Sequence, residues 1–146
     1  MGDVTYGACC VDDLSAWALG CDYLIHYAHS CLVPISDMVL KGVLYVFVEI
    51  SLNCDHFAQT VNTYFDSTSS SKEEPLYLVG TIQFSTAIYK SKRLLEKQGF
   101  KDVWIPQTKP RAGGEVLGCT APWIESKDAI VVFLADGWFH IESTMI

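Results

Sequence analysis

The sequence predicts an α/β fold made of repeated small parallel-sheet domains with helices on both faces. Three observations predict this class. Apolar strand-like runs alternate with helical segments along the 146 residues, an order typical of parallel sheets covered by helices. Half of the residues are apolar and they are spread along the whole chain, which is enough for one ordinary core or two small ones. Finally, one order of motifs occurs twice, which indicates an internal repeat.

The first half of the chain predicts two helices and two strands. Val11–Leu19 follows a cysteine-containing turn, and Asp12 and Asp13 suit the N-terminus of a short helix there because their side chains can accept hydrogen bonds from its unpaired N–H groups. Residues 23–27 form an apolar run that we expect to be a buried strand, and 43–50 form a second one. Asp55–Phe65 has the spacing of an amphipathic helix.

The second half begins after a Ser-rich charged link at Ser67–Glu74. Leu76–Thr81 predicts a third strand. Thr86–Gln98 predicts a helix, because Lys and Arg gather toward its C-terminal end and Gly99 can stop it. A strand at 102–105, a loop with the sequence PQTKPRAGG and a final strand at 129–134 complete the expected order.

Charge and hydropathy exclude several classes of protein. Ten basic and seventeen acidic residues give a net charge of −7, and no Lys/Arg stripe is present, so direct nucleic-acid binding is not expected. The longest apolar runs are far shorter than the roughly 20 residues of a membrane-spanning helix. Residues 1–20 do not have the pattern of a secretion signal. We therefore expect a cytoplasmic protein without a membrane partner.

The six cysteines do not form a familiar motif. No CxxC is present, and in a cytoplasmic protein thiols stay reduced, so Cys21, Cys31 and Cys54 are interpreted as small buried side chains. Cys9 and Cys119 differ, because "YGAC" and "LGC" place each of them on a glycine turn that precedes a spacer and a strand opening with Asp. Thiolates that converge on glycine loops suit a soft metal centre. Two are too few for such a centre, so a further ligand has to come from elsewhere.

Longer motifs identify a family that the chain resembles. "GDVTYGACCVDDLSAWALGCDYLIHYAHSCLVP", "VLYVFVEI", "GTIQF", "GEVLGCTAP" and "DGWFHIESTMI" resemble the eukaryotic subunit 1 type of diphthamide-synthesis enzyme, over residues 2–146. The resemblance implies three related Rossmann-like domains, each giving one cysteine to a [4Fe-4S] cluster that binds S-adenosylmethionine at its open iron. It also implies a radical reaction that transfers the 3-amino-3-carboxypropyl group to a histidine of translation elongation factor 2. The implied partners are a homologous second subunit and an electron-donor protein.

Mapped onto this chain, the resemblance implies that Cys9 and Cys119 are cluster ligands. About one and a half to two domains would be present, with the first repeat at 1–74 lacking its N-terminal part, the second at 75–146, and the third absent together with its cysteine. The chain would then be a fragment. We expect the two units to meet near the Ser-rich link, with Cys9 and Cys119 facing a common cavity.

Polar and small residues at strand ends are the candidates for cofactor contacts, because α/β folds bind ligands at the carboxyl ends of their strands. They are His29, Ser30, Gly80, Thr81, Gln83, Asp136, Gly137 and His140. His29 is equally well explained as a hydrogen-bonded structural histidine. Trp17, Trp123 and Trp138 stand where the family leads us to expect Arg, and the loss of a cation at Trp138 would weaken binding of a carboxylate.

Three functions therefore stay open at this stage. The first is a subunit of the S-adenosylmethionine-dependent transferase. The second is a noncatalytic fragment that keeps the fold and the partner surface. The third is an iron–sulfur or redox scaffold that does not use S-adenosylmethionine.

Overall fold

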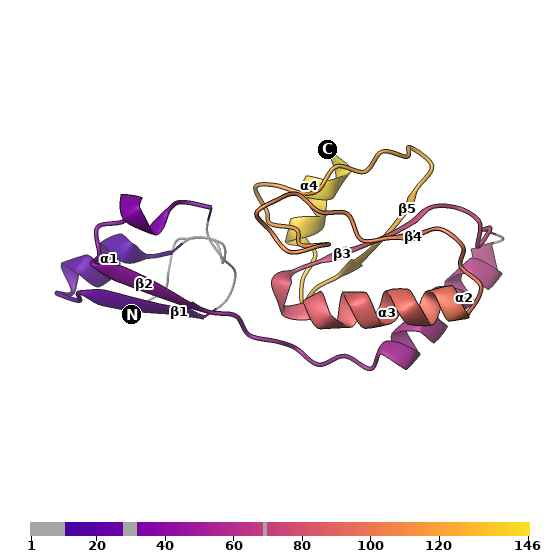
Figure 1. Cartoon of the computed structure of the whole chain (residues 1–146), viewed down its shortest axis with the longest axis horizontal. Helices are drawn as coiled ribbons and strands as arrows, with labels where there is room; N and C mark the ends of the chain where they lie inside the picture. Colours follow the sequence, from indigo (N-terminus) through magenta and orange to yellow (C-terminus); the bar gives the residue numbers. More distant parts are fainter. Residues whose placement is uncertain (1–10, 28–31, 69) are drawn as a thin grey trace. The chain divides into compact units, whose positions relative to one another are not determined.

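The computed structural model describes residues 11–27, 32–68 and 70–146, which form two compact units (Figure 1). Unit 1 is Met1–Val48 and unit 2 is Glu49–Ile146. Both contain parallel sheets, so the predicted α/β class with small parallel sheets is confirmed. The division at 48/49 differs from the boundary that we expected between the repeats, at 74/75, because helix α2 packs within unit 2.

Unit 1 is a short helix and a two-stranded parallel sheet. Helix α1 (Asp13–Ala18) precedes strand β1 (Tyr23–Tyr27), the 3-10 turn η1 (Ile35–Asp37) and strand β2 (Gly42–Val46). The two strands pair from Tyr23 opposite Gly42 to Tyr27 opposite Val46. The second strand is four residues shorter at its C-terminal end than predicted.

The caps of α1 follow the sequence in part. Asp12 is the N-cap, and its Oδ1 accepts a hydrogen bond from the Ser15 amide at 3.3 Å, as predicted. Asp13 has a different role, because its Oδ2 accepts a hydrogen bond from the Val39 amide at 2.9 Å. Asp13 therefore ties the loop before β2 to the start of the helix.

The expectation that β1 is buried is wrong. Exposed and half-buried side chains alternate along it, and Tyr23, Ile25 and Tyr27 form the exposed set. The sheet has only two strands, and one face of β1 points away from α1 and stays open among the described residues. An apolar run alone cannot tell a strand covered on both faces from one covered on a single face.

Unit 2 contains a three-stranded parallel sheet in the order β4-β3-β5. Its elements along the chain are α2 (Cys54–Thr68), β3 (Leu76–Gly80), η2 (Ile82–Phe84), α3 (Ser85–Lys97), β4 (Val103–Trp104), β5 (Ile130–Leu134), η3 (Phe139–Ile141) and α4 (Glu142–Met145). Helix α3 ends at Lys97, one residue before the predicted end, and Gly99 follows as the predicted stop with a positive φ of 95°, a conformation that favours glycine. The elements η3 and α4 were not predicted.

The core of unit 2 lies between the sheet and helices α2 and α3. Leu76 and Leu78 of β3 point into it together with Ile88 and Leu95 of α3. Phe65 of α2 meets Phe100 edge to face, with ring centroids 4.8 Å apart. Figure 1 shows α4 on the side of the sheet away from α3, so helices lie on both faces of this sheet.

None of the helices in the described residues is long and apolar enough to cross a membrane.

Candidate functional site

The carboxyl ends of β3 and β5 meet at Gly80 and Leu134, which are partners in the register of the sheet. A Cβ atom on Gly80 would lie 2.2 Å from the Leu134 carbonyl oxygen, so only glycine permits this approach. The Gly80 amide donates to the Gly114 carbonyl at 2.8 Å, and the Val116 amide donates to the Gly80 carbonyl at 2.9 Å. The long loop after β4 is thereby held against the end of the central strand.

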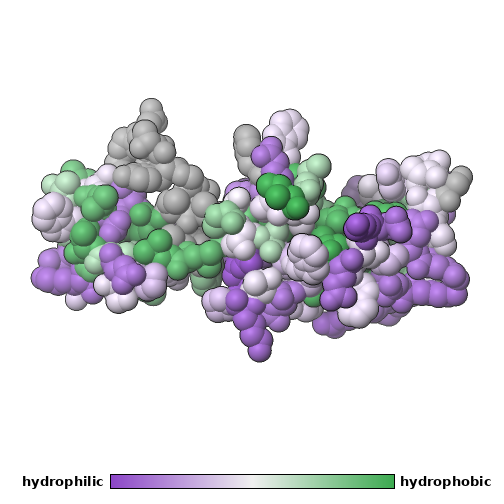
Figure 2. All heavy atoms as spheres, turned by 90° about the horizontal axis from the view of Figure 1, so that it is seen from above, coloured by the Kyte–Doolittle hydropathy of each residue, from purple (hydrophilic) through white to green (hydrophobic). Residues whose placement is uncertain are grey.

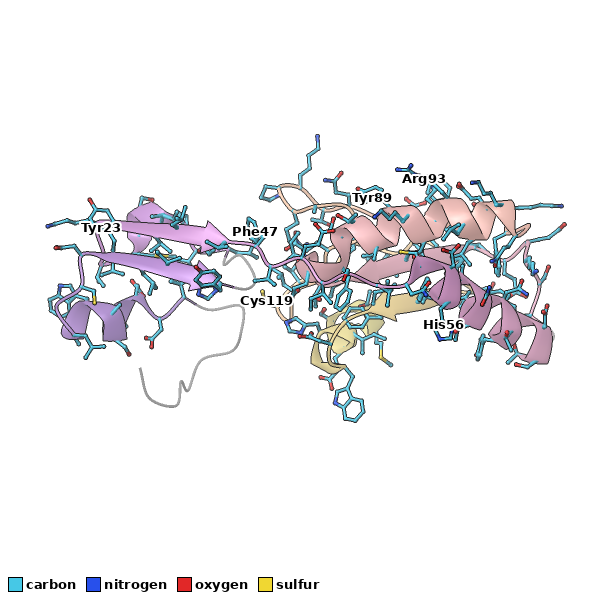
Figure 3. All side chains as sticks on the ribbon, turned by 90° about the horizontal axis from the view of Figure 1, so that it is seen from below. Tyr23, Phe47, His56, Tyr89, Arg93 and Cys119 are labelled. Carbon is cyan, nitrogen blue, oxygen red and sulfur yellow. The ribbon has the colours of Figure 1, made fainter. Side chains whose placement is uncertain are left out.

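Cys119 lies on a tight turn just beyond this contact. The Leu117 amide donates to the Thr120 carbonyl at 2.9 Å and the Thr120 amide donates to the Leu117 carbonyl at 3.2 Å, so Gly118 and Cys119 form a two-residue turn. The thiol is free and exposed. Figure 3 shows Cys119 in the loop at the end of unit 2 where β3 and β5 terminate.

Side chains hold this turn from two directions. The Arg111 guanidinium donates to the Thr120 carbonyl at 2.8 Å and to Thr120 Oγ1 at 3.1 Å. Ser143 Oγ, at the start of α4, lies 2.8 Å from the Leu117 carbonyl and 2.7 Å from the His140 carbonyl, either of which can accept its proton. Sequence reasoning missed both residues, since an arginine in a polar loop and a serine near a chain end carry no distinguishing pattern.

His140 lies beside the same turn. A Cβ atom placed on Gly118 would be 3.7 Å from His140 Cδ2, so the imidazole edge lies close to the residue preceding Cys119. His140 is half-buried, whereas Asp136 and Gly137 are exposed in the bend after β5. The structure therefore brings His140 to the turn that carries Cys119 and leaves Asp136 and Gly137 at the surface.

Thr81 and Gln83 follow β3 at this end of the sheet and are only 1% and 9% exposed. Thr81 Oγ1 and Gln83 Oε1 have no hydrogen-bond partner within the described part of the chain. Buried polar atoms are nearly always paired, so an unpaired one marks a position where a ligand or water could bind. Their contact with a ligand stays a prediction.

Comparison with known proteins places this geometry in a family. The family model for diphthamide synthesis proteins matches residues 1–146, the whole chain. The chain belongs to the diphthamide synthesis protein family. This agrees with the resemblance found in the sequence motifs.

Among the diphthamide synthesis proteins, the chain is similar to 2-(3-amino-3-carboxypropyl)histidine synthase subunit 1. It is 52% identical to that subunit from Nematostella vectensis over 146 residues, and 49% identical to that from Gallus gallus. All of this chain is covered in both cases, but only 30% and 34% of those relatives. The chain thus spans about a third of the length of the curated relatives that it matches.

A solved structure has a fold similar to that of this chain. Dph2 from Pyrococcus horikoshii, solved with a 4Fe-4S cluster, superposes with a TM-score of 0.66 at 25% sequence identity. The match covers 96% of this chain and 39% of that one. A second crystal structure of the same Dph2 protein gives a TM-score of 0.64.

A [4Fe-4S] cluster needs several iron-binding side chains close together, chiefly cysteine thiolates. Among the described residues, no group of three or more His, Cys, Asp or Glu side chains could hold a metal ion. Cys119, an exposed thiol on a turn without a bulky neighbour at Gly118, fits one ligand position. Cys9, His29 and Ser30 lie outside the described residues, so their expected roles and the common cavity of Cys9 and Cys119 remain predictions.

The two predicted Cys-turn repeats differ in their spacers. We expected a short element after each cysteine, as α1 provides in the first copy. After Cys119, residues 121–129 hold no helix or strand, and only a turn at 127–128 precedes β5. The glycine-turn cysteine and the parallel strand that follows it are nevertheless present in the second copy.

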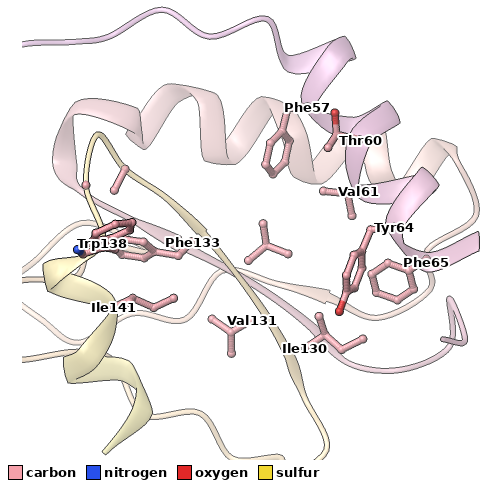
Figure 4. A pocket seen from close by; sticks show the side chains of 13 residues that line it. Phe57, Thr60, Val61, Tyr64, Phe65, Ile130, Val131, Phe133, Trp138 and Ile141 are labelled. Carbon is pink, nitrogen blue, oxygen red and sulfur yellow. The ribbon is translucent and has the colours of Figure 1, made fainter. Parts of the chain in front are cut away.

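The three tryptophans that stand where we expected Arg are exposed. Trp138 lies in the bend between Asp136 and His140, and its ring lines an apolar pocket of about 570 Å³ between α2 and the outer edge of β5. Figure 4 shows the labelled side chains of this pocket, among them Phe57, Val61 and Tyr64 of α2 and Val131 and Phe133 of β5. Trp138 thus extends an apolar surface beside the segment that carries His140.

Proposed function

We propose that this chain is the part of a 2-(3-amino-3-carboxypropyl)histidine synthase subunit 1 that supplies Cys119 to a [4Fe-4S] cluster. The complete enzyme would transfer the 3-amino-3-carboxypropyl group of S-adenosylmethionine to a histidine of translation elongation factor 2, in the first step of diphthamide biosynthesis. The observation that carries the proposal is the exposed Cys119 thiol, fixed on a two-residue turn at the carboxyl end of a parallel sheet. The names of the relatives and the 4Fe-4S cluster of the archaeal Dph2 structure support it.

The chain's own residues would have distinct tasks. When bound, the cluster would supply one electron to the sulfonium of S-adenosylmethionine. Cleavage of a carbon–sulfur bond by a single electron gives a radical. Cys119 would bind one iron as a thiolate, and Cys9 would be a second ligand. Thr81 and Gln83 offer unpaired buried oxygens that can accept hydrogen bonds from an ammonium or hydroxyl group of S-adenosylmethionine.

The remaining candidate contacts would complete that binding surface. His140 borders the Cys119 turn, and Gly80 allows the close approach of backbone there. Asp136 and Gly137 lie in the exposed bend after β5, and His29 and Ser30, which lie outside the described residues, are the other predicted contacts. These assignments are predictions about contacts with S-adenosylmethionine.

The proposed partners are proteins. A homologous second subunit, elongation factor 2 as substrate and an electron-donor protein would act with this chain. The net charge of −7 does not favour contact with nucleic acid. A cytoplasmic location follows from the same proposal, because the substrate is a translation factor.

One observation favours a second candidate function. Only Cys9 and Cys119 of this chain match the cysteine ligand positions that the resemblance implies. A cluster held by two thiolates does not have the single open iron that the reaction uses. The alternative is therefore a noncatalytic chain that keeps the fold and the surface for the second subunit.

Anaerobic reconstitution with iron and sulfide tests the ligand role of Cys119. We expect bound iron and visible cluster absorption that fall sharply in Cys119→Ala and Cys9→Ala. Cys54→Ala is the matched control, because Cys54 is half-buried at the start of α2, where its Sγ lies 3.9 Å from the Ala87 carbonyl. Equal iron binding by wild type and Cys119→Ala would refute the ligand assignment.

The same samples decide between the two functions. After addition of dithionite and labelled S-adenosylmethionine, we expect residues 1–146 alone to put no label on elongation factor 2, because the resemblance implies three cysteine ligands and only Cys9 and Cys119 match them. Label on the factor that disappears in Cys9→Ala or Cys119→Ala would show that two family ligands suffice, and would exclude the noncatalytic alternative.

A further inference from the structure

Arg111 is an unusual residue in the loop between β4 and β5, because its side chain is only 6% exposed. Its guanidinium forms no ion pair within residues 11–27, 32–68 and 70–146. All the acceptors found for it are neutral oxygens: the Thr120 carbonyl, Thr120 Oγ1 and, at 3.4 Å, the Glu115 carbonyl. Because a buried charge is costly unless it is hydrogen-bonded, these contacts are the ones that keep Arg111 in place.

The backbone that carries Arg111 is itself fixed. The Arg111 amide donates to the Thr108 carbonyl at 3.1 Å, and Gln107 Nε2 donates to the Arg111 carbonyl at 2.8 Å. One residue later, the Ala112 amide donates to Glu115 Oε2 at 3.0 Å. The guanidinium therefore projects from a loop that is tied down on both sides of Arg111.

Arg111 contacts Thr120, the residue that closes the turn of Cys119. The Thr120 carbonyl accepts hydrogen bonds from both Arg111 Nη1 and the Leu117 amide, so one oxygen joins the guanidinium to the turn. The second bond, from Nη2 to Thr120 Oγ1, fixes the side chain of the same residue. A planar fork that holds two acceptors restricts both position and orientation, which a lysine cannot do.

We infer that Arg111 is a positioning residue for Cys119: it holds the two-residue turn so that the thiol is presented in one orientation. It acts through Thr120 and does not contact the reacting groups. That the thiol so presented binds a cluster iron rests on the proposed function, whereas the hold of Arg111 on the turn does not.

Hydrogen exchange of the backbone amides, followed by NMR at the Leu117 and Thr120 amides, tests the inference without any cofactor. In Arg111→Met, which keeps the stem and removes the charge, we expect the Leu117 and Thr120 amides to exchange about tenfold faster or more, because two hydrogen bonds from a charged group are lost. Exchange in β3 should not change. The exchange rates in Arg111→Lys should lie between those of the wild type and of Arg111→Met, since lysine keeps the charge but lacks the planar, two-pronged guanidinium.

Two further variants keep the test decisive. Arg93→Met removes an exposed arginine of α3, labelled in Figure 3, and should leave the turn unchanged. Thr120→Val keeps the carbonyl and removes only the Oγ1 acceptor, so it should speed exchange of the turn more weakly, and it stands in if Arg111→Met does not fold. Unchanged exchange at Leu117 and Thr120 in Arg111→Lys and Thr120→Val overturns the inference.

Anaerobic reconstitution separates this inference from the proposed function. If both hold, Arg111→Met loses Cys119-dependent cluster absorption faster than wild type does. If wild type forms no Cys119-dependent cluster but the turn exchanges faster in Arg111→Met, the ligand assignment fails and the hold of Arg111 on the turn stands. If the cluster forms equally well in both proteins and exchange is unchanged, Arg111 has no positioning role and the proposed function is unaffected.

Discussion

At the scale of single residues, the site in unit 2 depends on a glycine that lets two strand ends approach closely and on side chains that donate hydrogen bonds to a turn. Gly80 leaves room where β3 and β5 converge, while Arg111 and Ser143 supply hydrogen bonds to the turn of Cys119. The sequence could identify Cys119 and Gly80 because long motifs contain them. It could not identify Arg111, because whether a loop arginine is buried depends on what packs around it.

Substitution of Gly80 by alanine should destabilise unit 2 by roughly 2–3 kcal/mol, because the new Cβ would overlap the Leu134 carbonyl and force the strand ends apart. Gly137→Ala is the control, since a Cβ there meets no heavy atom within 4 Å. Urea unfolding of both variants measures the effect. Equal midpoints would show that the end of the sheet can relax to admit a methyl group.

A second residue-scale prediction concerns the ion pair of Glu73 and Lys101. The hydrogen bond from Lys101, together with its charge, lowers the pKa of the Glu73 carboxyl below its ordinary value. A lowered pKa means that the pair stabilises the fold above the ordinary pKa of Glu and that this contribution is lost as the pH falls through the folded-state pKa. Both side chains are exposed, so the effect on stability is small.

An NMR titration of the Glu73 carboxyl checks this direction. In Lys101→Met the pKa should rise toward its ordinary value, whereas Lys97→Met, which removes another exposed lysine, should leave it unchanged. A Glu73 pKa that is the same in wild type and in Lys101→Met would contradict the ion pair.

At the scale of elements, most helices and strands could be predicted from the pattern of the sequence. The apolar runs and helical spacing gave the order α1, β1, β2, α2, β3, α3, β4, β5, with ends that differ by up to four residues. What the pattern could not show is which neighbours each element has. Helix α2 could be read as the end of the first repeat, but its buried face packs into the core of unit 2.

Phe65 tests the placement of α2. Its side chain is 1% exposed and meets Phe100 edge to face, so Phe65→Ala should lower the free energy of unfolding of unit 2 by about 3–5 kcal/mol. The neighbouring Tyr64 is 56% exposed, and Tyr64→Ala should cost far less, about 0.5 kcal/mol. Urea midpoints compare the two, and a similar loss in both would mean that α2 does not dock through Phe65.

At the scale of the whole molecule, apolar side chains remain at the surface of both units. Figure 2 shows apolar residues on the outside of the chain. In unit 1 the exposed face of β1 contributes them, and in unit 2 the pocket between α2 and β5 does. Among the described residues β5 pairs only with β3, so its other edge borders that pocket.

The isolated chain should therefore bind a dye that is specific for apolar surface and should self-associate. Trp138→Ser, which removes a ring from the pocket beside β5, should weaken dye fluorescence. Trp123→Ser is the matched control, because Trp123 is equally exposed but does not line that pocket. A monodisperse monomer without affinity for the dye would contradict the prediction.

The sequence by itself determined the α/β class, the order of the main elements, the family and the identity of Cys119 as the candidate ligand. These follow from local periodicity and from contiguous motifs, which are properties of neighbouring residues. The tertiary structure alone decided that α2 belongs to unit 2, that β1 has an open face, and that Arg111, Ser143 and His140 gather around the Cys119 turn. Such contacts join residues far apart in the chain, because burial and packing are decided by three-dimensional neighbours that no local pattern specifies.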